Sequence, residues 1–179
     1  MHCARLTIRK VGNSIVWSWW MAEGNGSSAG NENAPQLNVL VQFMRDFSFE
    51  NPRAPASFAE QNDAPNISIQ VNVNAEKHSE TEFEVSLHIE GSAGEGAKTL
   101  FKFELDYGGV FSLQNIPEEE LQPIVLIECP RLLFPFARQI IADGVRNGGY
   151  PPLYIDPIDF VALYQQQLEQ MSGGSTATN

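Results

Sequence analysis

Strict alternation of apolar and polar side chains constrains the fold of this chain more than any other feature of its sequence. Residues 67–74 run Ile-Ser-Ile-Gln-Val-Asn-Val-Asn, and residues 83–90 run Phe-Glu-Val-Ser-Leu-His-Ile-Glu. A third alternating segment covers residues 100–107. Because successive side chains of a strand point to opposite faces of a sheet, these segments predict antiparallel strands with one apolar and one polar face.

Two further segments complete the predicted sheet. Residues 110–113 form a short apolar run after the glycine pair at 108–109. Residues 37–49 precede the other strands and alternate as well. The predicted apolar face of this first strand consists of Val39, Val41, Phe43, Phe47 and Phe49.

Helical patterns follow the strands. Residues 117–121 place a proline ahead of three glutamates, which is typical of a helix N-terminus because carboxylates there lie near the positive end of the helix dipole. A second helix is predicted over about 131–146, ending at the Asn-Gly-Gly of 147–149, and a third over 156–170. Strands followed by helices predict an α+β fold.

The length of 179 residues fits one domain, since roughly 150 residues per domain is usual. We place that domain at residues 37–171, followed by a flexible tail at 172–179. Residues 21–36 are rich in Gly, Ser, Asn and Glu and predict a disordered tail. Residues 1–20 differ from the rest, and we expect them to be an extension that precedes a true start at Met21. No apolar run approaches the roughly 18 residues of a membrane span, so membrane insertion is not expected.

The charge of the chain is acidic and unevenly distributed. The formal net charge is −11, from 22 acidic and 11 basic residues. Three of the basic residues precede Met21, which leaves eight basic residues against 22 acidic ones in the remainder. Such a surface repels phosphate backbones, so nucleic acid is not an expected ligand, and basic partners are.

Reactive and metal-binding patterns are missing from the sequence. None of the histidines, His2, His78 and His88, has the spacing of a metal pair, and neither glycine pair belongs to a phosphate-binding motif. Cys3 and Cys129 form no disulfide framework, so a reducing compartment is the simpler interpretation. We therefore expect neither an enzyme nor a cofactor, although a site assembled from distant residues remains an alternative.

An aromatic row lies on one face of the predicted strand 100–107 and has two interpretations. It is either an ordinary core strand or a surface that faces another subunit, because aromatic side chains dominate interface energetics. The two interpretations combine if the sheet packs against a symmetry mate. The row consists of Phe101, Phe103, Leu105 and Tyr107.

Four segments together resemble the SecB family of export chaperones. They are Asp-Phe-Ser-Phe-Glu-Asn-Pro at 46–52, Tyr-Gly-Gly-Val-Phe at 107–111, Cys-Pro-Arg-Leu-Leu-Phe-Pro-Phe-Ala-Arg at 129–138, and Pro-Pro-Leu at 151–153 before a helix with Asp-Phe-Val-Ala-Leu-Tyr. The segments occur in order over residues 37–171. The third segment is the most unusual of the four.

The resemblance implies a cytoplasmic chaperone whose subunit has a four-stranded antiparallel sheet with helices on one face. It implies a homotetramer, arranged as a dimer of dimers, without nucleotide, metal or catalytic residues. Its grooves would bind unfolded precursor proteins, and the SecA motor ATPase would dock on the acidic outer face of the sheet. By position, Asp46, Glu50 and Glu104 are similar to the carboxylates that face SecA. Lys102 departs from the apolar residue expected beside them.

The resemblance also assigns the aromatic side chains. Phe101, Phe103, Leu105 and Tyr107 are similar to residues that join subunits and border the client grooves. Tyr164 is similar to an aromatic that lines a groove. The tail at 172–179 is short and uncharged, which departs from a C-terminus that adds contacts to SecA.

A second function stays open from the sequence. Residues 6–14 resemble the first β-hairpin of AbrB/MazE-type DNA-binding antitoxins, although the rest of that module is absent. The alternative is therefore a SecB-like chaperone dedicated to a toxin–antitoxin partner.

Overall fold

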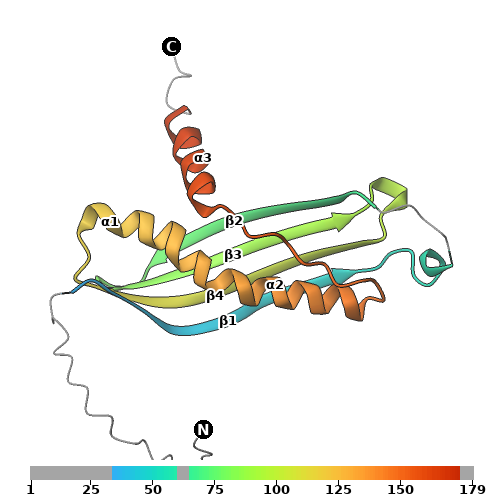
Figure 1. The fold of residues 1–179 in the computed structure, drawn as a ribbon, viewed down its shortest axis with the longest axis horizontal. Helices are drawn as coiled ribbons and strands as arrows, with labels where there is room; N and C mark the ends of the chain where they lie inside the picture. The colour runs from blue at the N-terminus through green and yellow to red at the C-terminus, as the bar shows by residue number, and fades with distance from the viewer. Residues whose placement is uncertain (1–33, 60–64, 174–179) are drawn as a thin grey trace, which may run out of the picture. The chain divides into compact units, whose positions relative to one another are not determined.

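The computed structural model describes residues 34–59 and 65–173. Four strands form one antiparallel sheet in the order β1-β4-β3-β2, so β1 and β2 are its two edges (Figure 1). Residues 1–33 and 174–179, on which the predictions of an N-terminal extension and of two tails largely depend, lie outside the described residues. The strands are β1 (Gln36–Glu50), β2 (Ile67–Lys77), β3 (Glu82–Ala93) and β4 (Phe101–Gln114).

The helices follow the sheet, so the predicted α+β class with a four-stranded antiparallel sheet is confirmed. Helix α1 (Glu118–Pro123) continues through a π-helical turn, η3 (Ile124–Glu128), into α2 (Cys129–Asn147). After an extended segment comes α3 (Phe160–Gly173). No helix among the described residues is long and apolar enough to span a membrane.

Helix α2 lies across one face of the sheet, mainly over β4 and β3 (Figure 1). Two glycines allow this close approach. A Cβ atom on Gly109 of β4 would lie 2.9 Å from Leu133 of α2, and one on Gly144 of α2 would lie 2.4 Å from the Phe47 ring of β1. The sheet therefore has a helix-covered face and an opposite, open face.

The core lies between α2 and the helix-covered face. Its strand residues come from the alternating segments, and α2 contributes one apolar stripe with a spacing of three to four residues. Burying such side chains stabilises the fold by roughly 1.5–3 kcal/mol each. The fully buried side chains include Val85, Leu87, Ile89, Leu105, Phe111, Leu133, Ile141 and Val145.

The predicted apolar face of β1 is wrong in its middle. The pairing of β1 with β4 shifts register between Val39 and Val41 and again between Met44 and Asp46. Each bulge inserts one residue, and because the side-chain period of a strand is two, it moves the following side chains to the other face. Val41 and Phe43 consequently lie on the open face, and Phe43 packs over Gly108. Val39, Phe47 and Phe49 stay on the helix-covered face.

The third helix begins later than predicted, at Phe160 instead of residue 156. Asp159 accounts for the difference, because its carboxylate accepts hydrogen bonds from the backbone N–H groups of Val161 and Ala162 at 3.0 and 3.1 Å. This is the geometry of an N-cap, and aspartate is among the residues that best supply it. The second helix agrees with its prediction to within two residues at each end.

A polar network around Tyr150 ties one end of the sheet to the C-terminal end of α2. The Tyr150 hydroxyl donates to Asn51 Oδ1 at 3.0 Å, and it also lies 3.3 Å from the carbonyl oxygen of Leu100 and 3.1 Å from Ser57 Oγ. Asn51 Nδ2 donates to the carbonyl oxygen of Gly148 at 3.0 Å. The Tyr150 hydroxyl, which follows α2 in the chain, therefore connects the residue after β1 with the residue before β4.

We expect Tyr150→Phe to lower the free energy of unfolding by about 1–2 kcal/mol, because the lost hydroxyl leaves partly buried partners unsatisfied. Chemical denaturation monitored by circular dichroism measures this change. Tyr154→Phe is the matched control, since Tyr154 is 62% exposed, and it is expected to alter stability by less than about 0.5 kcal/mol. Equal effects of the two substitutions would show that the network contributes nothing.

Candidate functional site

The described residues contain no group of three or more His, Cys, Asp or Glu side chains that is able to hold a metal ion. Cys129 is fully buried in the core. Burial, with a smaller contribution from Glu128, raises the pKa of its thiol to about 12. At neutral pH the thiolate, which is the reactive form, is therefore scarcely populated. The functional surfaces of this chain have to be sought in its faces and edges.

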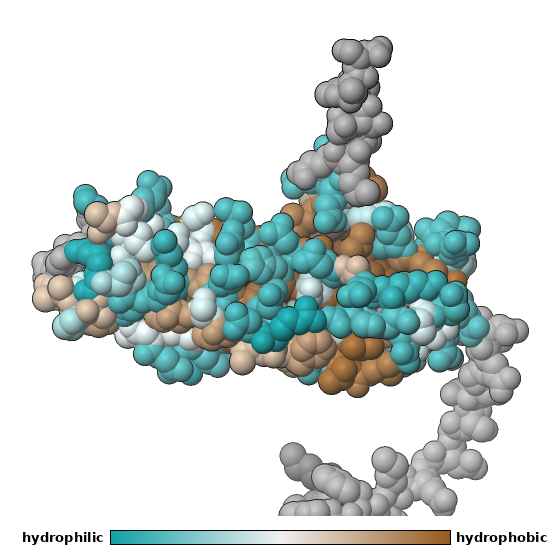
Figure 2. Space-filling model, turned by 180° about the vertical axis from the view of Figure 1, so that it is seen from behind, coloured by the Kyte–Doolittle hydropathy of each residue, from teal (hydrophilic) through white to brown (hydrophobic). Residues whose placement is uncertain are grey.

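The open face of the sheet carries several acidic side chains. Toward the end of the sheet where β1 finishes and β4 begins, strand pairing arranges side chains of this face in three lateral rows, each running across all four strands from β1 to β2. Figure 2 looks onto this face, and hydrophilic residues cover most of it. The rows are Asp46–Asp106–His88–Asn72, Ser48–Glu104–Glu90–Gln70 and Glu50–Lys102–Ser92–Ser68.

All three carboxylates that the sequence predicted for docking, Asp46, Glu50 and Glu104, lie on this open face, one in each row. The structure adds Asp106 and Glu90, which sequence reasoning did not single out. Their positions on the polar side of alternating strands were visible in the sequence. Their adjacency was not, because it depends on the register between strands. The rows thus bring five carboxylates to one face.

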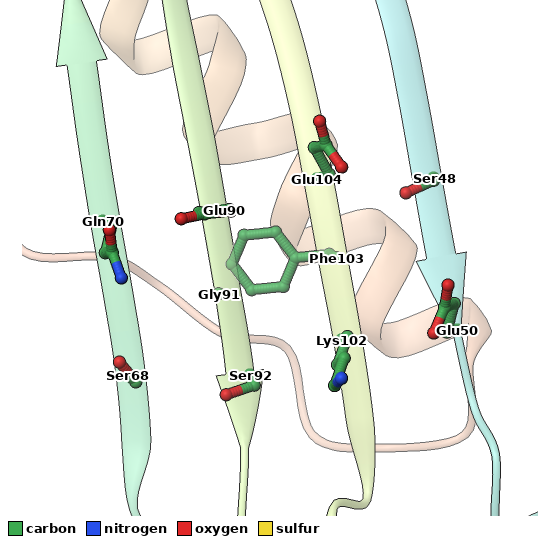
Figure 3. A pocket seen from close by; sticks show the side chains of 10 residues that line it. All are labelled: Ser48, Glu50, Ser68, Gln70, Glu90, Gly91, Ser92, Lys102, Phe103 and Glu104. Carbon is green, nitrogen blue, oxygen red and sulfur yellow. The ribbon is translucent and has the colours of Figure 1, made fainter.

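A shallow hollow of about 290 Å³ lies across the second and third rows. Glu50, Glu90 and Glu104 line it together with Lys102, and the remaining lining residues are mostly small and polar (Figure 3). The Phe103 ring lies against Gly91, where a Cβ atom would be only 2.5 Å from the ring, and both residues border the hollow. The hollow is therefore an acidic surface feature with one cation in it.

Two histidines contact carboxylates of the same face, and one of them, His88, lies between two of these. His88 Nδ1 lies 3.3 Å from Asp106 Oδ1, and His88 Nε2 lies 3.8 Å from Glu104 Oε1. Farther along the sheet, Glu84 contacts both Arg45 and His78. The hydrogen bond with His78 lowers the pKa of Glu84, Arg45 lowers it further, and partial burial opposes both. The contacts with His78 and Arg45 thus favour the ionised form of Glu84.

The predicted aromatic row lies on the helix-covered face, where α2 covers it within the single chain. All four of its members are buried: Phe101, Phe103, Leu105 and Tyr107. What remains exposed over the row is Phe136 of α2, which is 52% exposed and stacks on Tyr107 with ring centroids 6.5 Å apart. Burial also raises the pKa of Tyr107, whose hydroxyl donates to Gln42 at 3.2 Å.

Apolar side chains of β1 and α2 are exposed around this point. Met44 of β1, 53% exposed, is the register partner of Tyr107, and Leu132 lies one turn before Phe136 on α2. We call Met44, Leu132 and Phe136 the apolar ridge. Val39, Leu40 and Val41 are also exposed on β1, an edge strand, and Figure 2 shows a hydrophobic patch over the start of this strand. An exposed apolar edge strand is a surface that invites pairing.

A groove runs beside the other edge of the sheet, between β2, η3 and α3. It consists of two adjoining hollows of about 160 and 420 Å³, which share Val73, Leu126 and Gln167. Tyr164, predicted from the sequence as a groove-lining aromatic, lines the smaller hollow together with Leu163. Phe83 and Val125 line the larger one. The groove offers a mixture of apolar and polar contacts beside residues 71–77 of this edge strand.

Comparisons with known proteins agree on one family. The family model for the preprotein translocase subunit SecB matches residues 30–171. A protein-export protein SecB of Beijerinckia indica is 61% identical over 155 residues, which cover 87% of this chain and 97% of that protein. SecB of Azorhizobium caulinodans is 62% identical, over 83% of this chain and 92% of the relative.

A solved structure has the same fold. A SecB-like chaperone of Mycobacterium tuberculosis, in complex with a peptide from the HigA1 antitoxin, superposes with a TM-score of 0.52. It is 16% identical and covers 69% of this chain and 91% of its own. At that identity the likeness concerns the arrangement of strands and helices.

Proposed function

The chain belongs to the SecB family of protein-export chaperones, and from this premise we propose that it holds unfolded precursor proteins ready for translocation and delivers them to the SecA motor. The observation that carries the proposal is the presence of an acidic open face and of a groove with apolar side chains in its lining on one small chain. The acidic face complements a basic docking element, and the apolar side chains of the groove complement those that an unfolded client exposes. The two relatives of about 60% identity carry the export name, so we prefer export to a toxin–antitoxin partner.

We propose that clients bind along the groove beside β2. A holding chaperone has to accept many sequences, so its binding energy must come from apolar burial, about 25 cal/mol per Å², and not from fixed polar geometry. Tyr164, Leu126 and Leu163 supply apolar area there. The glutamines at 166 and 167 give the groove polar contacts that water or a client backbone is able to share. This arrangement suits extended chains of varied sequence.

We propose that SecA docks on the open face through Asp46, Glu50 and Glu104. Glu90 and Asp106 lie in the same rows and add to the negative potential. Attraction between such a face and a basic element is long-ranged and weakens as salt is added. Docking and client holding would then use different sides of the sheet, so that one chain performs both together.

We propose that the working form is the homotetramer, a dimer of dimers, in the cytoplasm. The apolar ridge and the exposed edge of β1 supply surfaces that a second copy of the chain would bury. The role of Phe101, Phe103, Leu105 and Tyr107 in assembly is then indirect. They form the floor on which α2 rests, and the helix presents Phe136 outward from that floor.

Holding activity tests the proposed function directly. We expect the purified chain, without nucleotide, to suppress light scattering by a chemically denatured precursor on dilution. Tyr164→Asp should require at least about fivefold more protein for the same suppression, because it removes an aromatic contact and adds a carboxylate to the groove. Tyr154→Asp is the matched control, since this exposed tyrosine does not line the groove, and it should behave as the unmodified chain does. Unimpeded aggregation with the unmodified chain would refute the proposed function.

A further inference from the structure

Lys102 is the one lysine or arginine in the three rows of the open face. In the strand register, Lys102 lies opposite Glu50 of β1 and opposite Ser92 of β3. Residues opposed in this way have Cβ atoms roughly 4.5–5.5 Å apart and share a face of the sheet. Glu104 follows two residues along β4, so its side chain emerges on the same face about 7 Å away. Figure 3 shows Lys102 between Glu50 and the β3 side chains of the hollow.

The ammonium group of Lys102 is available to a ligand. Among the ion pairs within 4.0 Å in the described part of the chain, none includes Lys102. Its neighbour Glu50 likewise makes no ion pair there, whereas Glu104 is near His88 at 3.8 Å. No single carboxylate among the described residues neutralises this cation. Its presence in an acidic hollow therefore changes which charges on a ligand the hollow favours.

A uniformly basic segment fits this hollow poorly. Cations placed against Glu50 and Glu104 would bring a third cation close to Lys102, and like charges at such distances repel. A segment that carries an acidic side chain between two basic ones matches the hollow at all three positions. Opposing charges across an interface set which partner is accepted more than they set raw affinity.

We propose that Lys102 determines the specificity of the docking face, and that the docking segment of the partner presents an acidic side chain flanked by basic ones. The inference rests on the proposed function, because it assumes that docking occurs on the open face. Beyond that function, the inference specifies the charge pattern of the docking segment and names Lys102 as the residue that recognises this pattern.

Two synthetic peptides of about ten residues test the pattern, since that length spans the rows when extended. One peptide alternates arginine with serine. The other is identical except for glutamate in place of the central arginine. We expect the unmodified chain to bind the mixed peptide at least as tightly as the basic one in fluorescence anisotropy, although bulk attraction to an acidic protein favours the basic peptide. Clearly tighter binding of the basic peptide would overturn the proposal.

Lys102→Glu should shift the preference toward the basic peptide by at least about tenfold, because it turns an attraction for glutamate into a repulsion. Lys98→Glu is the matched control, since it changes net charge equally, is exposed, and lies outside the rows. We expect it to shift the preference by less than about twofold. Equal shifts in the two variants would refute a specific role for Lys102.

Binding of SecA separates this inference from the proposed function. If SecA binds the unmodified chain, yet the peptide preference responds equally to Lys102→Glu and Lys98→Glu, the docking function is supported and the proposed charge pattern is refuted. If SecA does not bind the unmodified chain, the proposed docking function itself fails, and the inference falls with it.

Discussion

Reversing Glu50 and Glu104 together, as Glu50→Lys with Glu104→Lys, is expected to abolish docking of SecA while the holding of unfolded clients survives. The two side chains lie in adjacent rows of the open face and line the same hollow. Each reversal turns one attraction for a basic group into a repulsion, on the order of 1–2 kcal/mol at a partly solvated surface. Together they should weaken SecA binding by at least about 100-fold, which corresponds to about 2.7 kcal/mol.

Holding should survive because the proposed client groove lies beside β2, η3 and α3, whereas both glutamates lie on the open face of β1 and β4. Titration calorimetry measures SecA affinity, and suppression of light scattering measures holding. Both are to be run at low and at physiological salt, since attraction between exposed charges is screened.

Glu80→Lys with Glu119→Lys is the control for net charge. It changes the charge of the chain by the same amount at exposed positions outside the three rows, in the β2–β3 turn and on α1. We expect this control to bind SecA within about threefold of the unmodified chain. Equal losses in the two double variants would mean that SecA responds to overall charge and not to the open face. Unchanged affinity in Glu50→Lys with Glu104→Lys would remove the site.

Which surface a strand residue reaches could be predicted from the sequence for β2, β3 and β4, because their alternation is unbroken. Leu87 and His88 go to opposite faces, as the pattern requires. In β1 the same reasoning fails at Val41 and Phe43. A bulge leaves no mark in the apolar pattern of that strand, since Val39, Leu40 and Val41 are all apolar. The register with β4 decides their faces, and register is a property of two strands.

The candidate site shows the same division. Asp46, Glu50 and Glu104 could be placed on the polar side of their strands from position and resemblance, and the structure brings them onto one face. That Asp106 lies beside Asp46, and Glu90 beside Glu104, could be known only from the pairing of β4 with its two neighbours, β1 and β3. Burial of the aromatic row beneath α2 required the tertiary packing, because alternation tells which face a side chain takes and not what covers that face.

That burial changes how the aromatic row would act in assembly. Side chains with almost no exposed surface make few contacts to a second subunit, so their effect must pass through α2. Phe136 is where this happens, because its ring rests on Tyr107 and still exposes half of its surface. Leu132, one turn earlier on α2, and Met44, opposite Tyr107 on β1, complete the apolar ridge. A substitution at Phe136 therefore tests assembly without disturbing the core beneath it.

We expect Phe136→Glu to dissociate the assembly into smaller species without unfolding the subunit. In a symmetric assembly each subunit presents the same ridge, so one substitution removes the aromatic contact from both sides of an interface. Loss of a buried aromatic anchor costs about 2 kcal/mol or more, and burying an unpaired carboxylate adds to that cost. Because the substitution changes both sides of the interface, we expect it to weaken association between subunits by at least about 1,000-fold.

Native mass spectrometry at micromolar concentration reads the outcome, with circular dichroism to verify that each variant is folded. Phe136→Leu is the conservative control, because it keeps an apolar side chain on the ridge and should retain the parent subunit number. Client holding should fall in Phe136→Glu if grooves of neighbouring subunits act together on one extended chain, since separated subunits lose that effective concentration. A folded Phe136→Glu chain that keeps the parent subunit number would exclude the ridge from the interface and leave the exposed edge of β1 to account for assembly.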